Sequence, residues 1–161
     1  MMRRPFLRWL VFFSLAFILA APALYAKGKL DFVARFTDAQ LGFDVATYQD
    51  TELPAGKQKV GLLSLRRGSV RNSSAFDLFE WPKIAALWAK ALQARSQSWV
   101  EVGSITETTP DPCTLALSAG PGVKFTISSA NQATITYVLP ESDLARFENA
   151  LNRVKDFLAL P

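Results

Sequence analysis

Apolar and polar residues alternate along several short stretches of the chain, and a period of two is typical of β-strands with one buried face. In the first half, such stretches lie at residues 30–36, 41–45, 60–65 and 75–79. In the second half, they lie at residues 98–105, 113–118, 123–127 and 133–139. The segment 66–74 is rich in serine, asparagine and glycine, and we interpret it as a turn. The pattern therefore predicts two groups of four strands.

Each group of strands is followed by a proline and then by apolar residues at the spacing of an amphipathic helix. Pro82 suits the first position of a helix near 82–95, because the N–H that proline lacks would be unpaired there. Pro140 precedes a second helix near 141–158. The two apolar stripes match when the chain is shifted by 60 residues. The helices therefore repeat along with the strands.

These elements predict an α+β fold in which a β-β-β-β-α unit occurs twice. We expect two antiparallel four-stranded sheets, each with one covering helix. The two units span about 29–97 and 98–160, and we expect them to form a single domain within residues 27–161. Because few residues are identical between the units, the repetition is one of pattern.

Residues 1–26 have the layout of a secretory signal peptide, with arginines, an apolar stretch and small residues in that order. The apolar stretch is shorter than the ~20 residues that span a bilayer, so we expect no stable membrane anchor. We predict cleavage after Ala26, which makes Lys27 the first residue of the mature chain.

The signal region leaves two export routes open. Its start is similar to the twin-arginine export motif, a similarity carried by Arg3, Arg4, Phe6 and Leu7. Its charged region is very short and its apolar region very hydrophobic, which favours the general secretory route. Both routes predict an exported protein, either periplasmic or secreted.

The bulk charge of the chain does not indicate an anionic partner. The full chain has 18 Lys and Arg against 14 Asp and Glu, but three of the cations lie in the signal region. The remaining charge is uneven, because residues 27–97 carry a net +4 and residues 98–161 a net −3. Any anionic partner must therefore be recognised by a local cluster of cations.

Such a cluster flanks the third predicted strand. It gives a candidate surface for a protein partner or a nucleic acid that consists of Lys57, Lys59, Arg66, Arg67 and Arg71. Trp81 stands at the following strand-to-helix corner, where its ring can staple the helix start or stack on a base.

The sequence lacks the residues that several common catalytic and metal-binding sites require. The chain has no histidine, which removes the commonest general base and metal ligand. A single cysteine, Cys113, can form neither an internal disulfide nor a thiolate zinc cluster. It is either a small buried apolar residue or a thiol that pairs with another chain. No phosphate-binding glycine motif occurs. We therefore expect a non-catalytic protein without a cofactor.

The order of the elements, with Lys27, Gly28 and Lys29 before the first strand, resembles the whirly family of single-stranded-DNA-binding proteins. The resemblance implies that aromatic residues on the strands stack on bases beside a cationic edge, in an oligomer.

The residues themselves favour another function. We expect an exported domain that associates with another protein or with its own copies, through exposed strand edges and the cationic hairpin around Arg66, Arg67 and Arg71. Two alternatives stay open. One is single-stranded nucleic-acid binding, and the other is transport of a small ligand in a cleft between the sheets.

Overall fold

The computed structural model describes residues 28–54, 58–107, 109 and 111–161. The predicted signal peptide, its cleavage residues Ala26 and Lys27, and Lys57 lie outside these residues. Within the described part of the chain, no helix is both long and apolar enough to cross a membrane.

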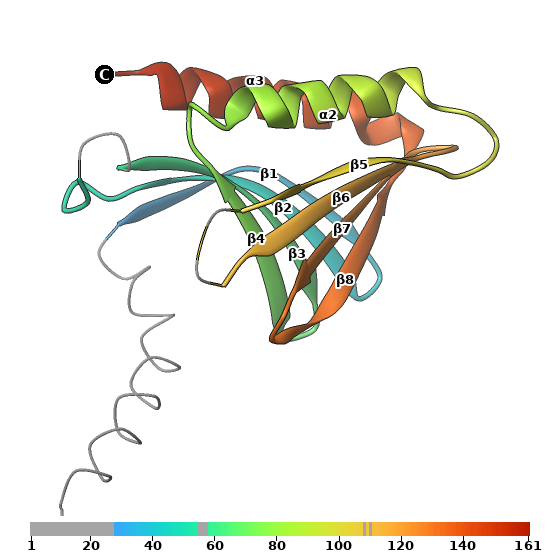
Figure 1. The fold of residues 1–161 in the computed structure, drawn as a ribbon, viewed down its shortest axis with the longest axis horizontal. Coiled ribbons are helices and arrows are strands. Elements are labelled where there is room, and N and C mark those ends of the chain that lie inside the picture. The colour runs from blue at the N-terminus through green and yellow to red at the C-terminus, as the bar shows by residue number, and fades with distance from the viewer. Residues whose placement is uncertain (1–27, 55–57, 108, 110) are drawn as a thin grey trace, which may run out of the picture.

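The described residues form eight strands and two α-helices in the predicted order (Figure 1). The first unit consists of β1 (Lys29–Asp38), β2 (Leu41–Gln49), β3 (Lys59–Arg67), β4 (Val70–Phe76) and α2 (Trp81–Gln93). The second consists of β5 (Val100–Thr106), β6 (Cys113–Ala119), β7 (Val123–Ser129), β8 (Gln132–Leu139), the short 3₁₀-helix η1 (Glu141–Asp143) and α3 (Leu144–Ala159).

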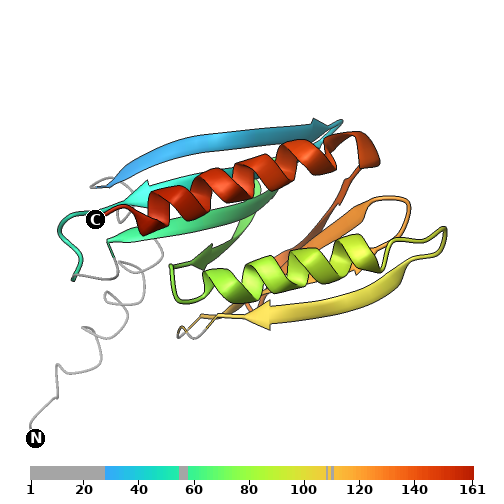
Figure 2. The ribbon, with the colours of Figure 1, turned by 90° about the horizontal axis from the view of Figure 1, so that it is seen from above.

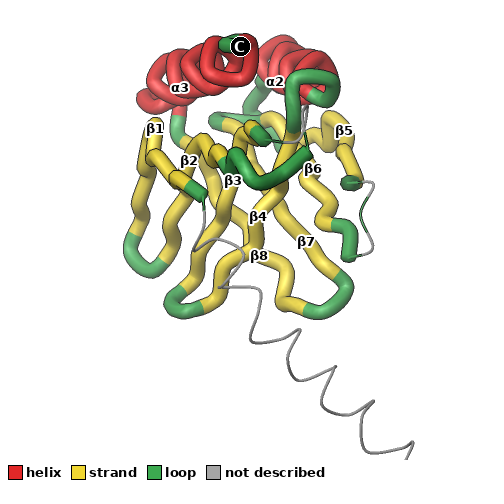
Figure 3. Tube along the Cα trace, turned by 90° about the vertical axis from the view of Figure 1, so that its left-hand side faces the viewer, coloured by secondary structure: helices red, strands yellow, loops and turns green. Residues whose placement is uncertain are grey.

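The strands form two four-stranded antiparallel sheets, one with the order β1-β2-β3-β4 and the other with the order β5-β6-β7-β8. The predicted α+β fold with a duplicated unit is therefore confirmed. The first strand of each sheet also carries a bulge, between Phe32 and Ala34 in β1 and between Glu101 and Gly103 in β5. β1 and β5 lie at opposite outer edges of the molecule, whereas β4 and β8 lie near its middle (Figure 3).

Each helix packs on the sheet of the other unit. Helix α2 contacts β5 and β6, whereas α3 contacts β1, β2 and β3. Both helices lie on the same side of the sheets, as Figure 2 shows from above. Each sheet thus has one covering helix as predicted, but the helix is contributed by the neighbouring unit. Because β4 and β8 end near the boundary between the sheets, the helix after each strand can cross to the other sheet.

The fourth strand begins earlier than the sequence predicts. We expected a turn over 66–74 and a strand at 75–79, but β4 spans Val70–Phe76. The turn consists of Gly68 and Ser69 alone, and Gly68 has a φ of +58°, which glycine adopts without a Cβ clash. The polar residues of β4 find partners in the fold, since the Ser73 hydroxyl lies 2.7 Å from that of Ser64. Composition alone therefore gave the wrong assignment.

The repeat of the helices has a different offset from the predicted 60. Helices α2 and α3 begin at Trp81 and Leu144, which are 63 positions apart. At this offset all four buried residues of α2 align with buried residues of α3, whereas at 60 the buried Trp88 would align with the exposed Glu148. The number of buried positions that align therefore favours an offset of 63 over the predicted 60.

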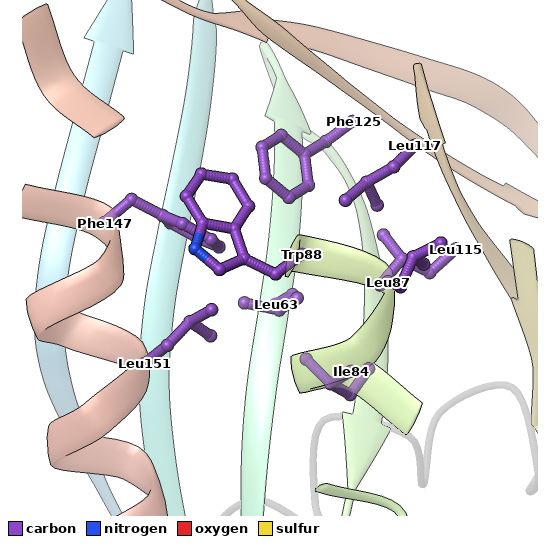
Figure 4. Close-up of a pocket in the computed structure, with 9 residues that line it drawn as sticks. All are labelled: Leu63, Ile84, Leu87, Trp88, Leu115, Leu117, Phe125, Phe147 and Leu151. Atoms are coloured by element: carbon purple, nitrogen blue, oxygen red, sulfur yellow. The ribbon is translucent and has the colours of Figure 1, made fainter. Parts of the chain in front are cut away.

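One cluster of buried apolar residues draws on both sheets and both helices. Phe147 of α3 lies near its centre, with ring centroids 5.3 Å from Phe43 of the first sheet and 5.0 Å from Phe125 of the second. Trp88 of α2 packs against the same ring at 4.7 Å. Figure 4 shows Trp88, Phe125 and Phe147 among the side chains around a cavity of only about 10 Å³, at the lower limit of the room that a water molecule needs. The two units therefore share one packed interior.

Candidate interaction surfaces

The described cationic residues of the candidate surface lie at the two ends of β3, as the sequence predicts. Lys59 lies at the start of β3, where its Nζ donates to the backbone oxygens of Leu160 at 2.8 Å and Pro161 at 3.1 Å. Arg66 and Arg67 lie at the other end of this strand. At ~3.3 Å per residue, the two ends are separated by roughly 25 Å. Lys59 therefore holds the C-terminus, while the arginines belong to the β3–β4 hairpin.

Trp81 is also separate from the hairpin, because it follows the far end of β4. Its ring is half-buried and lies 6.2 Å from the ring of Phe76. It packs against the central apolar cluster. This placement is that of a residue that staples the start of α2, the first of the two roles considered from the sequence.

One hairpin arginine, Arg71, binds an aspartate that the sequence did not indicate. Asp44 is only 2% exposed, and its Oδ2 accepts a hydrogen bond from Arg71 at 3.3 Å. Arg35 of β1 approaches the same carboxylate at 3.9 Å. Arg66 lies over Gly42, where a Cβ would come within 2.7 Å of its guanidinium. Two arginines thus share one buried carboxylate, with Arg66 over the neighbouring Gly42, on the face of the first sheet that points away from the helices. Strand pairing creates this cluster.

A cleft of about 710 Å³ opens beside this cluster. Its floor is a row of residues from the four strands of the first sheet, namely Phe32, Ala46, Leu62 and Ala75. The next row contributes the paired hydroxyls of Ser64 and Ser73. Arg71 lies beyond this row, at one end of the cleft. Residues at the start of β6 and in the preceding loop form the opposite wall, including Glu107, Asp111 and Cys113. The volume lies within the ~300–1,000 Å³ of ligand pockets.

Two groups on that wall have perturbed acidities. Burial raises the pKa of the Glu107 carboxyl. Hydrogen bonds from the backbone N–H groups of Ala75 and Cys113 oppose this effect. Ala75 N–H donates to Glu107 Oε1 at 2.6 Å, so the carboxylate covers part of the free edge of β4. Burial, aided by the nearby Glu107 charge, also raises the pKa of the Cys113 thiol. Cys113 is a free, half-buried thiol, and its raised pKa disfavours the reactive thiolate.

The inner edges of the sheets are closed to partners by contacts within the chain. Asn72 of β4 donates from Nδ2 to the carbonyls of Ile127 at 3.0 Å and Ala133 at 2.8 Å. These bonds fasten β4 to the second sheet at the β7–β8 hairpin. With Glu107 on Ala75, they satisfy groups that an unprotected edge strand would offer to another chain. Exposed edges must therefore be sought at β1 and β5.

The edge at β1 is closed by α3. Arg146 donates from Nη2 to the Arg35 carbonyl at 2.8 Å, and its guanidinium lies 4.6 Å from the centre of the Phe36 ring. The strand also carries a Lys29–Asp31 ion pair at 2.8 Å. Charges and a bulge on an edge strand both discourage pairing with another chain.

The edge at β5 is open. A groove of about 430 Å³ separates it from α2, and the lining residues are Lys83, Ala86, Leu87 and Lys90 of the helix and residues 102–106 of the strand. When the helices are aligned at the offset of 63, Lys83 of α2 corresponds to Arg146 of α3. When the strands are aligned at their bulges, Ser104 of β5 corresponds to Arg35 of β1. Within the described residues, the Lys83 side chain makes no hydrogen bond or ion pair, although its backbone N–H donates to the Glu80 carbonyl at 2.9 Å. The bond that closes β1 therefore has no counterpart here.

Apolar side chains are exposed where β5 begins. Trp99 is 41% and Val100 49% exposed. Lys124 lies 4.3 Å from the centre of the Trp99 ring, and Gly120 allows the ring to lie close to the backbone. This end of β5 thus offers a large aromatic surface in a fixed position, a common feature of protein interfaces.

Comparison with known proteins gives no family for the chain. No family model matches it, and no curated protein is significantly similar to it. Among the described residues, no three Cys, Asp or Glu side chains converge in a way that could hold a metal ion. The function must therefore be argued from the two surfaces above.

Proposed function

We propose that this chain is an exported, non-catalytic association module that binds an extended segment of a partner protein by strand addition at β5. The observation that carries the proposal is the open edge between α2 and β5, the counterpart of the edge that Arg146 closes on β1. An added strand gains main-chain hydrogen bonds from the edge and specificity from the side chains of the groove. Export rests on the N-terminal sequence alone.

The charge of the groove favours an acidic partner segment. Lys83 and Lys90 are two helical turns apart, ~10.5 Å along α2, and both line the groove. A second copy of the chain, paired edge to edge through β5, would bring two such helices together and set lysines against lysines. Like charges at an interface disfavour that pairing. An extended segment with alternating apolar and acidic residues suits both the groove and its rim.

The proposal is tested by fluorescence anisotropy with a labelled peptide of alternating valine and glutamate. Ser104→Pro should abolish binding, because proline removes a backbone N–H from the edge strand to which the peptide would pair. Thr37→Pro on β1 is the matched control and should leave binding unchanged. Charge reversal through Lys83→Glu with Lys90→Glu should weaken binding about tenfold, the equivalent of ~1.4 kcal/mol from two surface ion pairs, and should favour a valine–lysine peptide.

Three outcomes would contradict the proposal. The first is no binding of the acidic peptide to the wild-type chain. The second is equal loss of binding in the Ser104 and Thr37 variants, which would mean that proline acts through the fold. The third is a concentration-dependent dimer that Ser104→Pro dissociates, which would make a second copy the occupant of this edge.

Single-stranded nucleic-acid binding, the function that the whirly resemblance implies, is a weaker candidate. The half-buried ring of Trp81 packs on Phe76 and lies far along β4 from Arg66 and Arg67. The tryptophan and the hairpin arginines that the sequence offered for this function are thus on separate parts of the molecule. A titration with an oligonucleotide at low salt, read by tryptophan quenching and by its loss with added salt, tests this alternative directly.

A further inference from the structure

The outer faces of the two sheets, which point away from the helices, differ in chemistry although their strands correspond. Residues that pair across the four strands form a row, and the rows of the two sheets can be matched by their position relative to the bulges of β1 and β5. In the first sheet, this row consists of Phe32, Ala46, Leu62 and Ala75. In the second sheet, it consists of Glu101, Ser118, Lys124 and Val138. The first row is the floor of the 710 Å³ cleft, and the second is mostly a polar, solvated surface.

The neighbouring rows differ as well. Next to the apolar row, the first sheet carries Arg35, Asp44, Ser64 and Ser73. The equivalent row of the second sheet consists of Ser104, Ala116, Thr126 and Thr136, without a charge. The first sheet therefore sets a cationic and hydroxyl-bearing row directly beside an apolar one, which gives the cleft an amphipathic character.

The charges at this end of the cleft are unbalanced. Arg71 and Arg35 share one buried carboxylate, that of Asp44. The Arg71 side chain remains 41% exposed, so its guanidinium has donors left for another group. Arg35 lies 3.5 Å from the centre of the Phe32 ring, at the margin of the apolar floor. A negative group bound here would meet the positive charge that Asp44 does not neutralise.

We propose that this cleft binds an aliphatic carboxylate, with its chain on the Phe32–Ala46–Leu62–Ala75 row and its carboxylate at Arg71. The Ser64 and Ser73 hydroxyls stand between the two parts, and the one that accepts the bond between them keeps its own proton for the carboxylate. Charge-assisted bonds from arginine to a carboxylate are short and strong, and they fix the orientation of the ligand. Ligand binding here is independent of the β5 edge and does not require the association proposed above.

The acids of the opposite wall set the direction of the ligand. Glu107 and Asp111 lie across the cleft, and Glu107 is already bonded to the Ala75 N–H at 2.6 Å. A carboxylate is repelled from that wall and is held at the arginine end. An amine would take the reverse orientation. The comparison of an acid with an amine of equal chain length therefore tests the assignment.

The experiment measures displacement of the fluorescent probe 1-anilinonaphthalene-8-sulfonate by decanoate, decanol and decylamine. Arg71→Gln should weaken decanoate binding about tenfold, the loss of one charge-assisted interaction, and change decanol binding little. Phe32→Gln, at a residue 39% exposed, should weaken the binding of decanoate and decanol alike. Val138→Gln, in the equivalent row of the second sheet and 45% exposed, is the matched control and should change neither.

The proposal is overturned if none of the three compounds displaces the probe. It is also overturned if decylamine binds more tightly than decanoate, or if Val138→Gln weakens binding as much as Phe32→Gln. Far-ultraviolet circular dichroism of each variant should match the wild type. If Arg71→Gln alone loses the fold, Arg71→Lys replaces it and should retain part of the preference for decanoate over decanol.

Discussion

The two outer edges of the molecule have the same geometry and opposite accessibility. At β1, Arg146 of α3 donates to the Arg35 carbonyl at 2.8 Å and so occupies one acceptor of that edge. At β5, the equivalent helix position is Lys83, and a groove of about 430 Å³ takes the place of that contact. The difference depends on one basic residue, since arginine presents a rigid planar fork of donors where lysine has a single flexible ammonium.

The outer faces of the two sheets also differ, and here the first sheet has the more open surface. The first sheet, with the closed edge, has an apolar face with a cleft of about 710 Å³. The second sheet, with the open edge, has a face lined by hydroxyl pairs such as Thr126–Thr136 at 3.0 Å. Under the two proposals above, the first sheet binds through a face and the second through an edge. A duplicated fold would in this way separate two binding functions without a second domain.

The largest expected effect concerns the interior that the two units share. Phe147→Ala should lower the free energy of unfolding by about 3–5 kcal/mol, because it removes a buried ring that contacts both sheets and α2. Denaturant unfolding followed by tryptophan emission and by circular dichroism should still show one coincident transition. Two separated transitions would show that the sheets are independent, and the comparison would then concern two domains.

An intermediate effect is expected at the closed edge. Arg146→Ala should lower stability by about 1 kcal/mol, because it removes a hydrogen bond to the Arg35 carbonyl and a cation–π contact with Phe36. Amide exchange in β1 should accelerate more than in β5. The exposed Arg153 on the same helix is the control, and its replacement by alanine should change stability by less than about 0.5 kcal/mol. Equal losses of stability in the Arg146 and Arg153 variants would contradict the role of Arg146 at the β1 edge.

The smallest expected effect is a change in the pH dependence of stability. Burial raises the pKa of Glu107 above its ordinary value of 4.5 in the folded chain. The stability that it contributes is therefore fully present below about pH 4.5 and is lost as the pH rises through the folded pKa. Glu107→Gln stays neutral and keeps an oxygen for the Ala75 N–H. Its stability relative to the wild type should rise with pH, as measured by urea unfolding at several pH values. Parallel curves for the two proteins would contradict this account.

The elements themselves were largely predictable from the sequence. The alternation of Val123, Phe125 and Ile127 identified β7, and their side chains are buried as expected. Pro82 lies in the first turn of α2, as its missing N–H predicts. The assignment was wrong at β4, where Ser73 and Asn72 resemble turn residues by composition. Their partners are Ser64 and the carbonyls of the second sheet, which lie far away in sequence.

The candidate surfaces were less predictable than the elements. The sequence placed Lys59 and the arginines at opposite ends of the third strand, as observed, but it did not show that Lys59 binds the C-terminal backbone. Asp44 and Arg35 escaped notice because neither is close in sequence to the hairpin, and only strand register places them beside Arg71. The charge of a surface depends on which strands are neighbours, and this information is absent from local composition.

Apart from β4, the sequence by itself determined which segments form strands and helices and which face of each is buried, because the periods of two and 3.6 depend on local backbone geometry. The tertiary structure decided that each helix covers the sheet of the other unit, since both sheets offer an apolar face and only the positions of β4 and β8 make the crossing short. It also decided that Arg146 closes one edge while Lys83 leaves the other open. These outcomes depend on contacts between distant residues, where packing geometry rather than local preference determines the free energy.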